Sequence, residues 1–93
     1  MLSIQQIANA RQIASAQQLV RGYFEWFFEL VPGSETAPTF SGWENELASI
    51  PGHFVPPRGR YLLAETEGHA AGCIVLKPVS SETCELKRLF VHP

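Results

Sequence analysis

A long amphipathic helix is the feature that most constrains how this chain can fold. From about Ala10 to Val31, apolar side chains recur at spacings of three and four residues, and most charged and amide side chains lie elsewhere on the helical wheel. The apolar side consists of Ala16, Leu19, Val20, Tyr23, Phe27, Leu30 and Val31. Val31-Pro32-Gly33 ends the pattern. Because such a helix must bury its apolar side, the other segments of this 93-residue chain have to supply a surface for it.

The second half of this helix carries more aromatic side chains than packing on one sheet requires. Residues 23–28 read Tyr-Phe-Glu-Trp-Phe-Phe, which places rings on more than one side. The excess can be covered by another helix of the same chain, by a partner chain or by an acyl ligand. We favour packing within the core of the chain.

The segments on either side of the linker at 32–39 give weaker signals. Leu2 and Ile4 alternate with polar residues, which favours a strand at about 2–7, although Ser3 and Gln6 could instead form a capping box that opens one long helix. Ser41-Gly42-Trp43-Glu44 matches a capping box, so we expect a short helix at 42–49 that ends before Pro51-Gly52. Its apolar side would consist of Trp43, Leu47 and Ile50.

The remaining segments read as a three-stranded antiparallel meander. We expect an extended linker at 53–59, a strand at 60–66, a turn at Glu67-Gly68, a second strand at 70–77 and a third at 83–93. The run at 73–76 is apolar throughout, which predicts burial on both faces of the sheet. Gly72 inside that strand indicates a bulge or a close approach of two backbones.

The last strand combines apolar side chains with charges. Glu85, Lys87 and Arg88 are interspersed with Leu86, Leu89, Phe90 and Val91 in a segment that should be covered on at least one face. Charged groups in such a place are either paired or used for chemistry. This strand is therefore the first place to look for a site.

Composition excludes several classes of protein. The net charge of −2 gives no electrostatic reason to expect nucleic acid or an anionic membrane as a partner, and no apolar run approaches the length of a membrane span. The only cysteines, Cys73 and Cys84, fit buried unreactive thiols in a cytoplasmic protein, although neighbouring strands could bring them close enough for a disulfide. His53, His69 and His92 stand apart from other metal ligands, so we expect no metal site.

The sequence resembles the N-terminal part of the GNAT superfamily of N-acetyltransferases. The resemblance rests on the element order and on four stretches that are similar to a bacterial small-molecule branch: Pro56 to Ala64, Gly68, Ala71-Gly72-Cys73 and Glu85 to Val91. It implies one α+β domain over residues 1–93, with a mostly antiparallel sheet of about four strands and two helices in the order strand, helix, helix, strand, strand, strand.

The resemblance also implies a cofactor and site residues. In relatives, the backbone at Leu89, Phe90 and Val91 pairs with the pantetheine arm of acetyl-CoA, and the position of Glu85 is one where some members keep a carboxylate as general base toward an amine acceptor. Pairing of Glu85 with Lys87, Arg88 or a charge on the neighbouring strand is an equal alternative. The R/Q-x-x-G-x-G/A loop that holds the pyrophosphate in relatives occurs nowhere in these 93 residues, so we expect the chain alone to be inactive or weakly active.

A non-enzymatic role is the competing hypothesis. Part of a GNAT domain would leave the last strand with an unpaired edge and its aromatic helix partly uncovered, and such surfaces recruit partners. The partner would be the missing C-terminal half or a second copy, which could pair through Leu86 to Val91 or through Phe24 and Phe28 of the helix. Such a homodimer could bind an acyl-CoA or another small molecule without catalysis.

Overall fold

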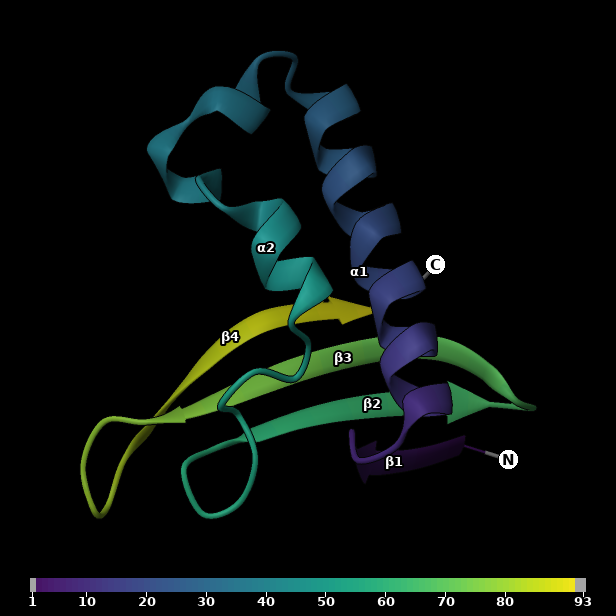
Figure 1. The fold of residues 1–93 in the computed structure, drawn as a ribbon, viewed down its shortest axis with the longest axis vertical. Coiled ribbons are helices and arrows are strands. Elements are labelled where there is room, and N and C mark those ends of the chain that lie inside the picture. The colour runs from purple at the N-terminus through teal and green to yellow at the C-terminus, as the bar shows by residue number, and fades with distance from the viewer. Residues whose placement is uncertain (1, 92–93) are drawn as a thin grey trace.

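A computed structural model describes residues 2–91 as a four-stranded antiparallel sheet with two α-helices (Figure 1). The elements are β1 (Leu2–Gln6), α1 (Ala10–Leu30), α2 (Trp43–Ala48), β2 (Arg60–Thr66), β3 (His69–Pro78) and β4 (Cys84–Val91). Two short 3-10 helices, Ser34–Thr36 and Pro38–Phe40, connect α1 to α2. The strands lie side by side in sequence order, so the predicted α+β fold and its element order are confirmed. His92 and Pro93 of the predicted last strand lie outside the described residues.

The first segment is a strand, and the capping box that opens the helix lies further along the chain. β1 pairs with β2 from Leu2 opposite Thr66 to Gln6 opposite Leu62. The side chain of Asn9 accepts a hydrogen bond from the backbone N–H of Gln12 at 2.8 Å, and the Gln12 side chain accepts from the Asn9 N–H at 3.2 Å. These bonds satisfy backbone donors that a helix start leaves free, so α1 begins directly after Asn9.

The second helix is confirmed, but its predicted capping box is wrong. The residue that precedes α2 is Gly42, whose φ of 78° is left-handed, and no side chain caps the helix. A capping box needs a side chain at this position that accepts from the helix backbone; glycine has none, and Ser41 lies one residue too early. The segment 53–59 is a linker without helix or strand, as predicted, but it is not extended, because it folds into turns in which Arg58 and Gly59 both donate backbone hydrogen bonds to the carbonyl of Val55.

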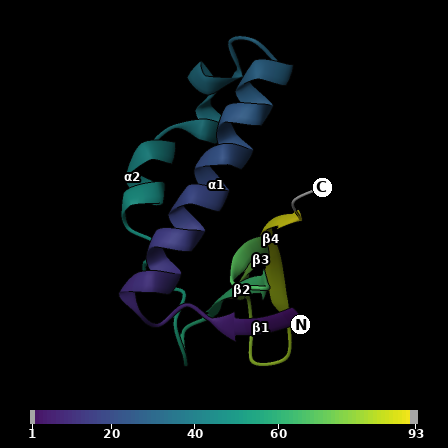
Figure 2. The same ribbon diagram turned by 90° about the vertical axis from the view of Figure 1, so that its right-hand side faces the viewer.

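Both helices cover the same face of the sheet (Figure 2). The buried core under them consists of Ile7, Ala16, Leu19, Val20, Phe24, Leu47, Ile50, Tyr61, Leu63, Cys73 and Val75. The opposite face presents Leu2, Ile4, Leu62, Ile74, Leu76, Leu86 and Val91. The prediction that 73–76 is buried on both faces is therefore wrong, since Ile74 and Leu76 remain half-buried where no helix of residues 2–91 covers them.

Of the aromatic residues of α1, Phe24 belongs to the core and Tyr23 and Phe28 pack against it, as favoured from the sequence, whereas Trp26 is 54% exposed. The Phe24 ring lies 6.0 Å from that of Phe28, 6.0 Å from that of Phe40 and 5.5 Å from that of Trp43, measured between centroids. Helix α2 and the 3-10 turn before it thus supply the cover that the sheet does not. Phe24 is only 1% exposed, so it offers no surface to a second chain.

Helix α1 crosses the strands from β1 toward β4, and its C-terminal half extends past β4, together with α2 (Figure 1). Within residues 2–91, β4 has a neighbouring strand on one side only, which is β3. The free edge of β4 therefore lies beside the extending part of the helical layer. Neither helix in this part of the chain is long and apolar enough to cross a membrane.

Candidate functional site

The pairing of β3 with β4 is interrupted by a bulge in β4. Cys73 pairs with Phe90 and Val75 pairs with Lys87, so Ile74 alone faces two residues, Arg88 and Leu89. The φ of Arg88 is 53°, a left-handed conformation that residues other than glycine rarely adopt. Bulges and such backbone strain are typical of sites where a strand must aim a side chain or stop pairing.

The thiol of Cys73 stabilises the bulge from β3. Its Sγ donates a hydrogen bond to the carbonyl of Arg88 at 3.4 Å. Burial raises the pKa of Cys73 to about 11, so the thiol remains protonated as a donor at neutral pH. Cys84 lies opposite Pro78 at the far end of the same hairpin and is exposed. The expectation that the two cysteines lie close together is therefore wrong, and Cys84 is not a buried thiol.

Arg88 extends from the bulge to α2. Its Nε and Nη2 atoms each lie 2.8 Å from a carboxylate oxygen of Glu46. The guanidinium also lies 5.9 Å from the centre of the Phe24 ring. The charge of Arg88 on the last strand is therefore paired, but its partner is Glu46, a helix residue that the sequence pattern did not indicate.

The predicted site residues lie on either side of this bulge. Glu85 precedes it, is exposed and lies opposite Lys77 in register. Within residues 2–91, the structure has two ion pairs, Arg11 with Glu65 and Arg88 with Glu46, so Glu85 pairs with neither Lys87 nor Arg88. Leu89 is the second residue of the bulge, and Phe90 and Val91 follow it up to the end of the described strand.

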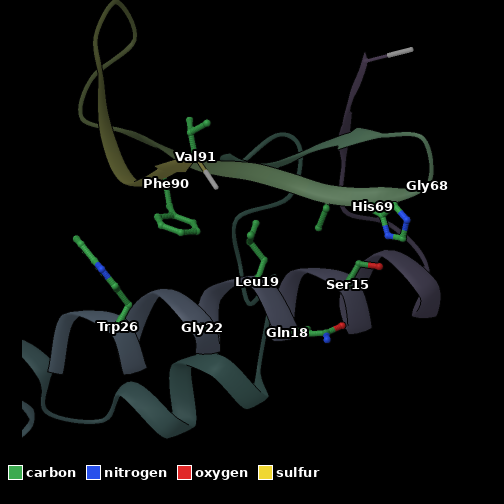
Figure 3. A pocket seen from close by; sticks show the side chains of 10 residues that line it. Ser15, Gln18, Leu19, Gly22, Trp26, Gly68, His69, Phe90 and Val91 are labelled. Carbon is green, nitrogen blue, oxygen red and sulfur yellow. The ribbon is translucent and has the colours of Figure 1, made fainter. Parts of the chain in front are cut away.

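A groove of about 780 Å³ lies between α1 and the end of β4 (Figure 3). We call it the α1 groove; Ser15, Leu19, Gly22 and Trp26 line it from the helix, and His69 and Phe90 line it from the sheet. In Figure 3, the Phe90 ring points toward α1, whereas Val91 points to the opposite side of the strand. Tyr23 packs against Phe90 with ring centroids 4.9 Å apart, which fixes the inner wall of the groove.

A second hollow of about 290 Å³ lies between α2, the turn after it and the other end of the bulge. We call it the α2 pocket; it is lined by Glu46, His53, Tyr61, Lys87 and Arg88, together with the turn at 49–52. The α1 groove has Ser15, Gln18 and His69 as polar lining, whereas the α2 pocket includes the acidic and basic side chains of Glu46, Lys87 and Arg88. Lys87 and Arg88 of β4 line the pocket, while Phe90 and Val91 of the same strand line the groove.

Tyr61 is the polar residue of this pocket that is buried without a partner. It is 3% exposed, and its hydroxyl finds no hydrogen-bond partner among residues 2–91. Burial raises the pKa of this hydroxyl, so it remains a proton donor over the physiological range. Sequence reasoning missed Tyr61 and Glu46, because a tyrosine in a strand and a glutamate in a helix are common and neither stands in a recognisable motif.

The histidines do not gather into a metal site in the part of the chain that the structure describes. His53 lies in the α2 pocket and His69 in the α1 groove, and residues 2–91 contain no group of three histidine, cysteine or acidic side chains placed to hold a metal ion. His92 lies outside these residues.

Comparison with known proteins indicates a relationship to an acetyltransferase. No protein-family model matches the sequence. The sequence is 32% identical over 94 aligned residues to an uncharacterized N-acetyltransferase of the fission yeast Schizosaccharomyces pombe, and the match covers 99% of this chain and 53% of that protein. The chain therefore spans about half the length of the curated relative that it matches. Because this relative is fungal, the similarity to a bacterial branch stays a prediction.

Proposed function

We propose that this chain is the N-terminal part of a GNAT-type acyltransferase domain, related to enzymes that transfer an acetyl group from acetyl-CoA to an amine. In this proposal, the edge of β4 at Leu89, Phe90 and Val91 receives the pantetheine arm, and Glu85 takes a proton from the acceptor amine. The relationship to an N-acetyltransferase and the four-stranded α+β fold support the assignment.

The observation that carries the proposal is the position of the bulge in β4. It lies on an edge strand at Arg88 and Leu89, and the strand then continues through Phe90 and Val91 along the wall of the α1 groove. An edge strand offers free backbone N–H and C=O groups, to which an extended amide-containing ligand can add as a further strand. Pantetheine is such a ligand, because it carries two amides along a flexible chain.

The α1 groove fits the apolar parts of the same arm. Phe90 and Trp26 supply apolar walls, and Gly22 leaves open space where a side chain of α1 would otherwise stand, since a Cβ at this position would meet nothing within 4 Å. A glycine in the middle of a 21-residue helix costs about 1 kcal/mol relative to alanine. A groove that must remain open is a physical reason for that cost.

Residues 2–91 do not offer a comparable binding site for the pyrophosphate of acetyl-CoA. Such an anion is held by backbone N–H groups that converge at a helix N-terminus. The start of α1 is occupied by its own side-chain caps at Asn9 and Gln12, and α2 has only six residues. Residues 2–91 therefore fit the arm of the cofactor but not its pyrophosphate, and we expect this chain alone to bind acetyl-CoA weakly and to be inactive or weakly active.

Acetyl-CoA supplies an acetyl group activated as a thioester. The chain's own contribution is to hold the acceptor and to accept the proton that an ammonium acceptor must lose before it can attack. Glu85 is exposed on β4, on the face that the helices cover, so its carboxylate Oε atoms are free to accept that proton directly or through water.

A titration of the 93-residue chain followed by amide NMR tests the proposal. We expect acetyl-CoA and pantetheine to bind with similar affinity, in the millimolar range or about −4 kcal/mol, because the chain does not recognise the pyrophosphate. The amide signals of Leu89, Phe90 and Val91 should shift with both ligands. Absence of any shift on β4, or shifts confined to the β1 edge of the sheet, would contradict the proposal.

Two variants separate the groove from the proposed base. Gly22→Leu places a side chain in the α1 groove and should abolish the shifts of the Leu89, Phe90 and Val91 signals. Gln17→Leu, on the α2 side of the same helix, is the control. Gly68→Leu is unsuitable as a control, because the φ of Gly68 is 81° and leucine rarely adopts this conformation. Glu85→Gln should leave pantetheine binding intact and should remove any acetyl transfer to a panel of small amines. Measurable acetyl transfer at the same rate by Glu85→Gln and the unmodified chain would exclude Glu85 as the base.

A non-enzymatic interaction module is the second candidate, and the uncovered face of the sheet favours it. Leu2, Ile4, Leu86 and Val91 are all more than half exposed on that face; Leu86 and Val91 lie on the edge strand β4, and Leu2 and Ile4 lie on β1 at the opposite edge of the sheet. Exposed apolar side chains beside a free strand edge recruit a partner, either a second copy of the chain or a C-terminal half of the domain. Light scattering tests the homodimer: a monomer at every concentration would exclude it, and a dimer should dissociate on Leu86→Lys.

A further inference from the structure

We propose that the α2 pocket binds the carboxylate group of a small amine-containing molecule. As a statement about the acetyl acceptor, this rests on the proposed function; as a statement about binding, it rests on the pocket alone. The pocket has a volume of about 290 Å³, which suits a molecule of amino-acid size better than a peptide or a nucleotide.

The buried hydroxyl of Tyr61 is the first reason. Tyr61 lies in the wall of the pocket, and its hydroxyl has no hydrogen-bond partner among residues 2–91. A buried polar group without a partner is costly, so its retention in a core of otherwise apolar residues needs an explanation. A ligand oxygen that accepts from this hydroxyl supplies one.

The donors around the hydroxyl select an anion. Arg88 uses Nε and Nη2 to bind Glu46, and the two N–H groups of its Nη1 atom have no hydrogen-bond acceptor among residues 2–91. Lys87 lines the same pocket and adds a second positive charge. Arginine and lysine present only donors, and the protonated hydroxyl of Tyr61 can donate as well, whereas a carboxylate presents only acceptors.

Glu46 narrows the choice among anions. Its carboxylate also lines the pocket, so a dianionic phosphate would meet a like charge there, whereas an ammonium group of the same ligand would meet an opposite one. A zwitterion with a carboxylate and an amine therefore fits the pocket better than a phosphate does. The pocket also lies next to the proposed cofactor edge, because Lys87 and Arg88 directly precede Leu89 on β4.

Three probes that share a four-carbon chain and differ in their charged end groups test whether the pocket requires a carboxylate. The ¹⁵N-labelled 93-residue chain is titrated with butyrate, 4-aminobutyrate and butylamine, and the amide signals of Tyr61, Lys87 and Arg88 are followed. We expect butyrate and 4-aminobutyrate to shift these signals and butylamine to leave them unchanged. Inorganic phosphate is the fourth probe, and tighter binding of phosphate than of butyrate would overturn the carboxylate assignment.

Variants test the residues. Tyr61→Phe should weaken butyrate binding about tenfold, the loss expected for a hydrogen bond to a charged group. Lys87→Gln should weaken it about threefold, the loss expected for a partly exposed charge. Lys77→Gln is the matched control, because Lys77 lies on the same face of the sheet two residues from Val75 but does not line the pocket. Unchanged affinity in both Tyr61→Phe and Lys87→Gln would overturn the proposal.

The two proposals fail separately. If pantetheine shifts the signals of Leu89 to Val91 but butyrate shifts none, the α2 pocket is not a carboxylate site and the acyltransferase assignment stands. If butyrate binds through Tyr61 and Lys87 but neither acetyl-CoA nor pantetheine binds, the pocket stands and its role as an acceptor site is lost.

Discussion

Arg88 on β4 binds both carboxylate oxygens of Glu46 on α2, with the two N–O distances each 2.8 Å. The bulge makes this possible, since the left-handed backbone at Arg88 interrupts the alternation of side chains along the strand just where the arginine reaches the helix. Helix α2 is only six residues long and would have little stability alone. The ion pair and the aromatic cluster around Phe24 therefore hold it on the sheet.

Replacing Glu46 with glutamine should loosen this attachment. Both side chains are about one-third exposed, so we expect a loss of about 1 kcal/mol in the free energy of unfolding, or a decrease of about 4–8 °C in Tm. Glu44→Gln is the control, because Glu44 lies on the same helix and takes part in neither of the ion pairs within residues 2–91. Equal Tm values for the two variants would mean that the pair contributes no net stability.

Tyr61→Phe should have the opposite effect on stability. The substitution removes a buried hydroxyl that has no partner within residues 2–91 and keeps the ring in the core, so we expect a gain of about 1 kcal/mol in the free energy of unfolding. Urea unfolding monitored by tryptophan fluorescence measures this change. A loss of stability would mean that the hydroxyl is satisfied in solution, and the argument for a ligand at Tyr61 would be weakened.

The fold could be predicted from the sequence where local signals agree with packing. Helix α1 has a regular apolar period and a clear stop, and the turn at Glu67-Gly68 has positive φ values of 51° and 81° at its two residues, which a glycine-containing two-residue turn favours. The prediction of a capping box at Ser41 was wrong because the four-residue pattern does not reveal which residue directly precedes the helix. Gly42 takes that place in a left-handed conformation, which glycine adopts readily.

The candidate site could be predicted only in part. The charges of β4 marked it in the sequence as the strand that carries the site. Gly72 was expected to mark a bulge or a close approach of two backbones, and the close approach is confirmed, because a Cβ at Gly72 would lie 2.7 Å from the carbonyl oxygen of Phe90. The partner of Arg88 could not be predicted, since Glu46 is 42 residues away and nothing local distinguishes it from Glu44. Sequence patterns report periodicity, whereas ion pairs depend on how elements cross.

Arg11 should control the acid stability of the chain. Hydrogen bonds from Arg11 hold the pKa of the buried Glu65 carboxylate below its ordinary value, with N–O distances of 2.7 and 3.0 Å. A pKa that is lower in the folded state contributes stability above the unfolded-state value of about 4.3, and this contribution is lost as the pH falls through the folded value.

Arg11→Gln should therefore lower stability at neutral pH and flatten its dependence between about pH 6 and pH 3. Arg21→Gln is the matched control, because Arg21 is an exposed arginine on the same helix that takes part in neither described ion pair. Urea unfolding at a series of pH values measures the difference. Parallel stability profiles for Arg11→Gln and the unmodified chain would show that the pair has no effect on acid unfolding.

The two thiols should differ sharply in reactivity. At pH 8, a thiol with a pKa of about 11 is ionised to roughly one part in a thousand, and Cys73 is also buried beneath the bulge. Exposed Cys84 should react at once with a disulfide reagent, and Cys73 should react only when β3 and β4 separate.

Cys84→Ser leaves Cys73 as the one slowly reacting thiol, and its labelling rate measures how often the β3–β4 pair opens. The rate should fall when pantetheine whose thiol is S-methylated, and which therefore cannot consume the reagent, occupies the edge of β4. Fast labelling of Cys73 in the folded Cys84→Ser variant would mean that the bulge opens freely.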